Sequence, residues 1–375
     1  MRVAVIHGGT STEHEVSLAG ARCIIEALEQ LGHEPLPILI DRTGEWHSPG
    51  ATGRAAVITA LLTCDVVVPA LHGVHGEDGT VQGLLEMLGL PYVGSGVRAS
   101  ALCLDKELTK AVVGRAGVPV AAGLRVDAPR VQQSIASKVD RGALLRELAH
   151  AGVRFPVFVK PVQGGSSIGV SRVPDPDSLR AALEAARAAA AGGAILIEPE
   201  VVGLEVDVPV LEQPDGSLRC GPTLLIDSDP REPFFNETAK YASAVTGFTI
   251  PAPLAPETTR ALEELALAAF RALGCRGLAR VDFFVTDTGP VLNEVNTFPG
   301  FTEHSQFPRM WATAGLSYQR LVATILATAH DNPFPLPDLL GRGPFHVGAR
   351  GAAHHHGDGS DIQDVPRSAA PDRQR

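Results

Sequence analysis

Acidic and amide side chains alternate along two short segments between residues 278 and 296, in a pattern that suits a divalent metal ion. Arg280 and Asp282 alternate in GLARVDFFV, and Glu294 and Asn296 alternate in PVLNEVN. Period-2 spacing puts each pair on one face of a β-strand. If the strands are antiparallel neighbours, Asp282, Glu294 and Asn296 form an all-oxygen set, which suits Mg2+. The alternative is the polar, solvent-facing side of an edge hairpin.

A lysine in an otherwise apolar strand precedes a turn rich in glycine and serine in VFVKPVQGGSSIGV. Lys160 needs an anionic partner, because an unpaired buried charge is costly. The turn, Gly164 to Ser167, lets backbone N–H groups wrap an anion such as phosphate, although it is not a Walker A loop. The alternative, an ordinary hairpin turn, explains the glycines but leaves the lysine unexplained.

Carboxylates also stand at the ends of two predicted strands in ILIEPEVVGLEVDV. Glu198 ends the first of these strands, and Glu205 begins the second after a short connection. Carboxylates placed in this way bind ribose hydroxyls or an amino group, or they are simply solvated. The pattern alone leaves both interpretations open.

The N-terminal segments HGGTSTEHEVS and LHGVHGEDGTVQG follow predicted strands and carry several acidic residues. A dinucleotide-binding loop is disfavoured, because G-x-G-x-x-G is absent and Glu13 would repel a pyrophosphate. Glu13, His72 and the Glu77–Asp78 loop instead suit a ligand with an amino group at the carboxyl ends of the strands. The alternative is that Glu13 and Glu15 only stabilise the N-terminus of a helix.

The segment NTFPGFTEHSQFP follows the predicted metal hairpin. Pro299 and Gly300 predict a tight turn whose N–H groups can face an oxyanion. Ser305 has a structural alternative as the cap of the next helix.

The elements that position these residues fall into three predicted domains. Strands and helices alternate over residues 1–105, which favours an open, mostly parallel sheet. Residues 106–203 hold a glycine-rich hairpin and an alanine-rich helix near 178–191, which indicate an α+β lid. Residues 204–330 are mainly β, with helices at 256–273 and 317–329. The remaining residues, 331–375, are predicted to be a disordered tail, in which His354 to His356 bind metal at most loosely.

The composition limits the classes of function. The chain has 375 residues, 45% of them hydrophobic, which is enough for a large core in two or three domains. Its net charge of -10 argues against binding to nucleic acid or an anionic membrane. The five cysteines form no C-x-x-C pair, so neither a zinc site nor a disulfide framework is expected. With no signal peptide or membrane span, the sequence predicts a cytoplasmic protein.

Taken together and in this order, these segments resemble the D-alanine:D-alanine ligase family of the ATP-grasp fold, over about residues 3–329. The resemblance implies an α/β and α+β multidomain protein, with ATP between the central and C-terminal domains. It also implies small-molecule D-amino acid substrates, peptidoglycan synthesis and a homodimer.

The resemblance assigns roles to individual residues. Those implied to bind the nucleotide are Lys106, Lys160 and Lys240 at the phosphates, Ser167 in the turn, Glu198 and the Val201 backbone at the adenine, and Glu205 at the ribose. Asp282, Glu294 and Asn296 are implied to hold two Mg2+ ions, with Glu294 bridging and Mn2+ as an alternative metal. Those implied to orient the first D-alanine are Glu13, Ser166 and Tyr241, while Arg280, the Gly300 N–H and Ser305 surround the reacting centre and the second carboxylate.

The implied reaction forms an acyl phosphate from the first D-alanine, which the amine of the second then attacks. A closing loop is expected at about residues 227–245, and Tyr241 favours a D-amino acid acceptor over a D-hydroxy acid. Two positions depart from the family's pattern: Pro199 follows Glu198, and Gln306 stands where a leucine or methionine is usual after the serine. Gln306 bears on which acceptor is used.

Three alternatives remain beside D-alanyl-D-alanine synthesis. The first is a paralogous ligase that acts on another D-amino acid. The second is a nucleotide-binding regulator with a dead site, which the complete set of acidic and lysine residues disfavours. The third is a scaffold protein, which would not be stabilised by nucleotide.

Overall fold

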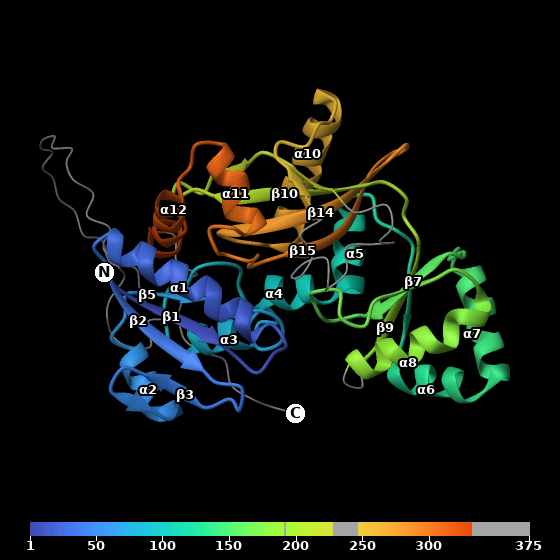
Figure 1. Ribbon diagram of the computed structural model, residues 1–375, viewed down its shortest axis with the longest axis horizontal. Helices are drawn as coiled ribbons and strands as arrows, with labels where there is room; N and C mark the ends of the chain where they lie inside the picture. Colours follow the sequence, from blue (N-terminus) through green and yellow to red (C-terminus); the bar gives the residue numbers. More distant parts are fainter. Residues whose placement is uncertain (191–192, 228–246, 332–375) are drawn as a thin grey trace, which may run out of the picture. The chain divides into compact units, whose positions relative to one another are not determined.

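The computed structural model describes residues 1–190, 193–227 and 247–331, all within one compact unit, Met1–Gly341. Three β-sheets and the helices that cover them make up this part of the chain (Figure 1). Lys240 and Tyr241 lie outside the described residues, as do most of the expected closing loop and all of the expected tail after Asp331, including His354 to His356.

The first sheet has the strand order β4-β3-β2-β1-β5. Its parallel strands are β1 (Arg2–Gly8), β2 (Glu34–Ile40) and β5 (Val66–Pro69). Four successive residues of β1, Val3 to Ile6, are fully buried, as expected for a parallel strand covered on both faces. The mostly parallel sheet predicted from the sequence is therefore right for these strands. The short strands β3 (Trp46–Ser48) and β4 (Ala51–Thr52) pair antiparallel at one edge.

Helices α1 (His14–Gln30), α2 (Arg54–Leu61) and α3 (Thr80–Met87) alternate with these strands. The loop between β1 and α1 carries Glu13, and the loop between β5 and α3 carries His72 and Glu77. Both loops leave the carboxyl ends of parallel neighbouring strands, so their side chains meet at one edge of the sheet.

The second sheet has the order β6-β9-β7-β8, with every neighbouring pair antiparallel. Its strands are β6 (Leu124–Val126), β7 (Val157–Pro161), β8 (Ser171–Val173) and β9 (Ile195–Pro199). The expected glycine-rich hairpin is the β7–β8 connection. Helices α6 (Ala128–Ala136), α7 (Lys138–His150) and α8 (Leu179–Ala189), with the short 3-10 helix η1 (Pro176–Ser178), gather beside this sheet (Figure 1).

Helix α8 shows why this layer packs. It buries Leu179, Ala182, Leu183 and Ala186, which recur at the three- and four-residue spacing of one helical face. These side chains join Val157, Val159 and Ile197 in one hydrophobic cluster, so the helix covers the strands that carry Lys160 and Glu198.

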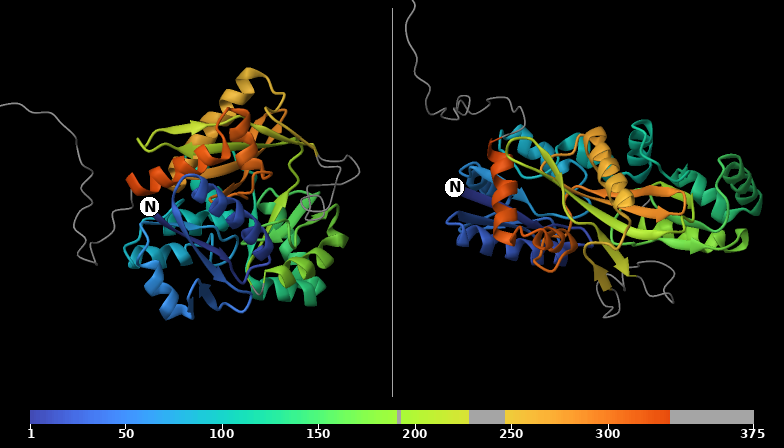
Figure 2. Two further views of the ribbon diagram at one scale, coloured as in Figure 1. Left: turned by 60° about the vertical axis from the view of Figure 1, so that its left-hand side comes forward. Right: turned by 90° about the horizontal axis from the view of Figure 1, so that it is seen from above.

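The third sheet has the order β13-β12-β10-β14-β15, with β11 paired to β10. Its strands are β10 (Leu204–Glu212), β11 (Leu218–Cys220), β12 (Leu224–Asp227), β13 (Gly247–Thr249), β14 (Leu278–Thr286) and β15 (Gly289–Asn296). Helix α10 (Pro256–Leu273) packs on β10 and β14, and Figure 2 shows it beside these strands. Helix α11 (Gln306–Thr313) follows Ser305, and no bounds were predicted for it. Helix α12 (Tyr318–Asp331) lies close to the helix predicted at 317–329.

Helices α4 (Val97–Leu104) and α5 (Lys106–Arg115) pack mainly on elements of the third sheet region. Val113 of α5 belongs to the same hydrophobic cluster as Val206 and Val281. The side chain of Asp105 accepts a hydrogen bond from the Leu108 N–H and begins α5. This packing places Lys106 beside β15, while the domain boundaries at 105, 203 and 330 stay predictions. No helix in the described ranges has the length and hydropathy of a membrane span.

Candidate active site

Two neighbouring pockets collect most of the predicted site residues. The first, called the lysine pocket here, is lined by polar residues that include Lys106, Lys110, Lys160, Ser167, Glu198, Glu205 and Glu294, and by apolar residues that include Phe158, Val201, Phe284 and Leu292. The second, called the arginine pocket, is lined by residues that include Glu13, His72, Glu77, Arg280, Asn296, Gly300, Ser305 and Gln306. Lys106, Gly164, Gly165, Ser166 and Glu294 line both pockets.

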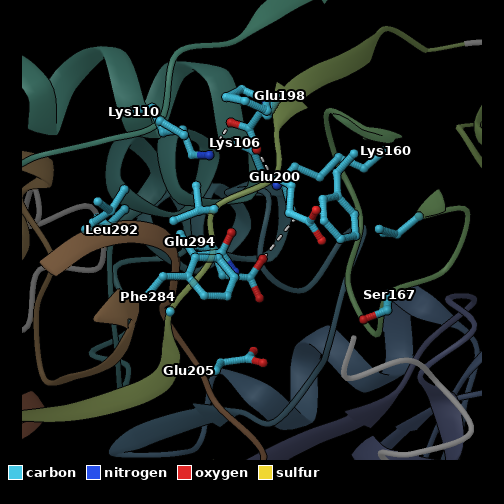
Figure 3. A pocket seen from close by; sticks show the side chains of 18 of the residues that line it. Lys106, Lys110, Lys160, Ser167, Glu198, Glu200, Glu205, Phe284, Leu292 and Glu294 are labelled. Atoms are coloured by element: carbon cyan, nitrogen blue, oxygen red, sulfur yellow. Dashed lines mark hydrogen bonds and ion pairs between the residues drawn. The ribbon is translucent and has the colours of Figure 1, made fainter. Parts of the chain in front are cut away.

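Glu198 lies between two lysines in the lysine pocket (Figure 3). Lys160 Nζ is 2.6 Å from one carboxylate oxygen of Glu198, and Lys110 Nζ donates a hydrogen bond to the other. All three residues are buried, which confirms that Lys160 has an anionic partner. The solvated alternative for Glu198 is therefore wrong, because the lysines occupy its oxygens.

Burial and the neighbouring charges shift the pKa values of Glu198 and Lys110 in this trio. Burial acts to raise the pKa of Glu198, but Lys160 and Lys110 outweigh it, and the pKa is lowered overall. Burial, with repulsion from Lys160, lowers the pKa of Lys110 to about 8. The trio carries one more positive than negative charge when fully ionised, which suits an anionic ligand.

Lys110 was missed from the sequence, although a signal was present. Lys106 and Lys110 are four residues apart at the start of α5, so they lie on one helical face. Lys106 Nζ donates to the carbonyl oxygen of Gly164 at 2.6 Å and lies 3.3 Å from Glu294 Oε2. One face of α5 thus carries both lysines: Lys110 pairs with Glu198 and Lys106 with Glu294.

The turn after β7 connects the lysine pocket with the first sheet. Ser166 and Ser167 adopt left-handed backbone angles, with φ of 52° and 57°. Ser166 Oγ donates a 2.7 Å hydrogen bond to Glu13 Oε1. A Cβ added at Gly165 would lie 3.2 Å from both Glu13 carboxylate oxygens, so any side chain there would press on the Glu13 carboxylate. Glu13 therefore binds the turn, which is more than the expected stabilisation of a helix N-terminus.

Strands β14 and β15 are antiparallel neighbours, as the sequence predicts for the proposed metal ligands. Arg280 pairs with Asn296 and Asp282 with Glu294 in the register. Asn296 Nδ2 donates to Asp282 Oδ2 at 2.9 Å. Glu294 lines both pockets, so the alternative of a purely solvent-facing edge is wrong for this side chain.

The donor set fits a hard divalent cation. Asp282 and Glu294 supply carboxylate oxygens and Asn296 supplies an amide oxygen, and each carboxylate has a cationic neighbour, Arg280 or Lys106. Within the described ranges, no group of three or more His, Cys, Asp and Glu side chains is placed to hold a metal ion. A metal at this site would therefore need the Asn296 oxygen or oxygens of a ligand.

Each nitrogen of the Arg280 guanidinium makes a hydrogen bond in the arginine pocket. Its Nε and Nη2 donate to the two oxygens of Asp282, at 2.8 and 2.7 Å. Its Nη1 donates to Gln306 Oε1 at 2.7 Å. Burial opposes the charge, yet Asp282 and Asp207 raise the pKa of Arg280 above its usual value. A charged guanidinium is thereby kept at the pocket wall.

Gly300 and Ser305 face one another across the turn before α11. A Cβ at Gly300 would lie 3.2 Å from Ser305 Oγ. Ser305 occupies the N-cap position of α11, but its hydroxyl accepts from the Thr302 N–H at 3.0 Å, and no helix N–H donates to it. The capping alternative for Ser305 is therefore wrong in its hydrogen bonding. Gly300 and Ser305 both line the arginine pocket.

The adenine-side and ribose-side candidates also line the lysine pocket. Glu205 lies on the opposite side of this pocket from Glu198 in Figure 3. Val201 and Pro199 line the pocket as well, so the unusual proline faces the ligand space. Glu200 makes a bidentate pair with Arg172, at 2.7 and 2.8 Å.

Sheets that face one another across a lysine-rich pocket, beside a pair of acidic strands, define an ATP-grasp enzyme. Family models described as D-ala D-ala ligase C-terminus and D-ala D-ala ligase N-terminus match residues 115–327 and, in two overlapping stretches, residues 2–60 and 53–95. The chain belongs to the D-ala D-ala ligase family.

Individual relatives cover most of the chain. A D-alanine--D-alanine ligase of Corynebacterium aurimucosum is 42% identical over 361 residues, which span 88% of this chain and 97% of the relative. The corresponding ligase of Mycobacterium bovis is 40% identical over 369 residues, with 88% and 95% covered.

Solved structures agree with this assignment. The VanG D-Ala:D-Ser ligase of Enterococcus faecalis has a TM-score of 0.72 at 32% identity, and 88% of this chain and 99% of that chain are covered. The D-alanine--D-alanine ligase of Bacillus anthracis complexed with ATP has a TM-score of 0.68 at 29% identity, with 88% and 97% covered.

Proposed function

We propose that this enzyme joins two D-alanine molecules at the expense of ATP, and so supplies D-alanyl-D-alanine for peptidoglycan. The observation that carries the proposal is the shared wall of the two pockets. Lys106, Ser166 and Glu294 line both, so a phosphate bound in the lysine pocket lies next to a carboxylate bound in the arginine pocket. Phosphoryl transfer followed by acyl transfer requires this adjacency. The curated relatives do not favour the alternative of another D-amino acid.

The lysine pocket is proposed to bind ATP. Lys106 and Lys160 place positive charge where the phosphates would lie, and the backbone of the turn with Ser167 wraps them. Glu198 and the Val201 backbone are assigned to the adenine, and Glu205 to the ribose. The ATP named in the Bacillus anthracis structure supports this assignment.

Asp282, Glu294 and Asn296 are proposed to hold two Mg2+ ions, for which Mn2+ is an alternative. When bound, the metal would neutralise charge on the phosphate oxygens during transfer. Lys106 Nζ, 3.3 Å from Glu294 Oε2, adds a fixed positive charge at the same place.

The first D-alanine is proposed to bind with its ammonium group toward Glu13. Ser166 holds the Glu13 carboxylate in place, and the expected third partner, Tyr241, lies outside the described residues. The substrate carboxylate attacks the γ-phosphorus of ATP, the bond to the β-phosphate oxygen breaks, and an acyl phosphate and ADP result. Lys240 is assigned to the same phosphate.

The second D-alanine is proposed to enter the arginine pocket, with its carboxylate near Ser305. Its free amine attacks the acyl carbon, and the amine proton and inorganic phosphate leave as the amide forms. Arg280 and the Gly300 N–H stabilise the oxyanion that develops on the acyl oxygen. The expected homodimer, the cytoplasmic location and the absence of nucleic-acid or membrane binding remain predictions.

Coupled release of ADP from purified enzyme tests the function directly. D-alanine is expected to support turnover and to give the dipeptide by mass spectrometry, whereas L-alanine, D-serine and D-lactate serve as competing substrates. Turnover that requires D-serine or D-lactate beside D-alanine would contradict the proposal. Ser166→Ala should raise the KM for the first D-alanine by about tenfold, because the Glu13 carboxylate loses a hydrogen-bond donor.

A further inference from the structure

Gln306, which departs from the family's pattern, makes a hydrogen-bonded bridge in this chain. Its Oε1 accepts from Arg280 Nη1 at 2.7 Å, and its Nε2 donates to Asp207 Oδ2 at 3.0 Å. Only this orientation of the amide suits both neighbours, because a guanidinium can only donate and a carboxylate accepts. A leucine or methionine at this position would make neither bond.

Asp207 was also missed from the sequence. It stands in the apolar run of β10 and is fully buried, so its carboxyl needs partners in the same way as Lys160 needs one. Arg280 Nε lies 3.3 Å from Asp207 Oδ2. Asp207 also faces Asp282 directly in the β10–β14 register. Arg280 and Gln306 therefore bring positive charge and hydrogen-bond donors to two adjacent buried carboxyl groups.

The three side chains that contact Arg280 differ in whether they are also candidate metal ligands. Asp282 is a candidate metal ligand, so its oxygens serve two cations. Asp207 and Gln306 are not candidate metal ligands, and they approach Arg280 from other elements, β10 and the start of α11. They can fix the direction of the guanidinium independently of Asp282.

We propose that Asp207 and Gln306 act as one positioning unit for Arg280. The bridge from Asp207 through Gln306 holds Nη1, and the direct ion pair holds Nε, so the guanidinium keeps one direction toward the reacting acyl oxygen. This inference rests on the proposed function for the role of Arg280 in the reaction. Arg280 is the catalytic residue of the group, and the other two act through it.

Steady-state kinetics of Gln306→Met and Asp207→Asn tests the unit. Gln306→Met keeps the length of the side chain but removes both hydrogen bonds, and kcat is expected to fall about tenfold with the KM for ATP within about twofold of wild type. The effects of the two substitutions on kcat should combine to less than their product. Gln306→Met removes the bridge, and Asp207→Asn weakens the same bridge by replacing its charged acceptor with a neutral one. Gln319→Met is the matched control, since it removes a surface hydrogen bond, 3.0 Å to Gln30 Oε1, and should leave kcat unchanged.

A spectroscopic measurement tests positioning without turnover. The Nε–Hε signal of Arg280, assigned by its absence in Arg280→Lys, should exchange slowly with water in the wild type and faster in Gln306→Met. Gln319→Met should leave this exchange unchanged.

Three outcomes would overturn the inference: unchanged kcat in Gln306→Met, unchanged exchange of the Arg280 signal, or effects of the two substitutions that multiply. If Asp207→Asn is insoluble, the kcat of Gln306→Met and the exchange rate of its Arg280 Nε–Hε signal together test the inference. A wild-type enzyme that makes no dipeptide would contradict the proposed function, whereas the exchange measurement would still decide the positioning.

Discussion

At the scale of single residues, the site depends on ionisable groups that the protein holds away from water. Glu198, Asp207 and Arg280 are all partnered by groups from other strands or helices. Glu77 is different, because the largest effect of a neighbouring charge on it comes from another carboxylate, that of Glu13. Desolvation, with repulsion from Glu13, raises the pKa of Glu77 to about 8, although Glu77 Oε2 accepts from the Gly73 N–H at 2.7 Å.

The raised pKa of Glu77 predicts a loss of stability as the pH rises. Between about pH 4.5 and about 8 the folded state binds this proton and the unfolded state does not, so the free energy of unfolding falls with pH. The slope from this one carboxyl is at most about 1.4 kcal/mol per pH unit. Glu77→Gln should flatten the profile, measured by urea unfolding across this range.

Glu29→Gln, on the exposed part of α1, is the control for this experiment and should keep the wild-type slope. Parallel profiles for wild type and Glu77→Gln would show that Glu77 ionises normally in the folded protein.

At the scale of elements, the loop between β1 and α1 places Glu13 only if β1 ends in a tight turn. Gly8 has a φ of 88°, and a Cβ there would lie 2.3 Å from the Ile40 carbonyl oxygen. The Gly9 N–H donates to that same oxygen at 2.7 Å. The parallel pairing of β1 with β2 thus brings the backbone too close for any side chain at Gly8.

Gly8→Ala is therefore expected to be far more destabilising than Gly50→Ala. Gly50 has a similar φ of 76°, with nothing within 4 Å of an added Cβ. Gly50→Ala should lower the free energy of unfolding by about 1–2 kcal/mol, because alanine disfavours the left-handed backbone conformation. Gly8→Ala adds a steric clash with backbone to that cost. Equal shifts in Tm for the two variants would show that β1 and β2 separate without penalty.

At the scale of the whole molecule, bound ATP is expected to contact helices and strands that are distant in the sequence. The lysine pocket is lined by α5, β7, β9, β10 and β15, so a ligand there stabilises the folded state against unfolding of all of them. Mg-ATP at ~100 times its Kd should add about 2.7 kcal/mol to the free energy of unfolding. A scaffold protein would show no such shift.

Lys110→Met should weaken this stabilisation, because Glu198 would lose one of its two cationic partners and the pocket one positive charge. The thermal shift with Mg-ATP, compared between Lys110→Met and wild type, is the measurement. Lys138→Met, at an exposed position of α7, is the matched control. An undiminished shift in Lys110→Met would place the nucleotide elsewhere.

Much of this protein was determined by local pattern in the sequence. Period-2 alternation predicted the β14–β15 pair, the apolar context of Lys160 predicted a buried anionic partner, and helical periodicity predicted α10 and α12. These properties depend on neighbours within a few residues, so they are visible in the sequence. The order of the segments was sufficient to indicate the ATP-grasp fold, which the solved structures confirm.

Only the tertiary structure decided which side chains share a partner. The Glu198 carboxylate is divided between Lys110 and Lys160, from α5 and β7, and Gln306, which is 99 residues from Asp207 in the sequence, joins Asp207 to Arg280. Ser305 turned from its helix to Thr302, which helix propensity does not foresee. A hydrogen bond between distant segments depends on how sheets and helices pack, because packing fixes distances that sequence spacing leaves free.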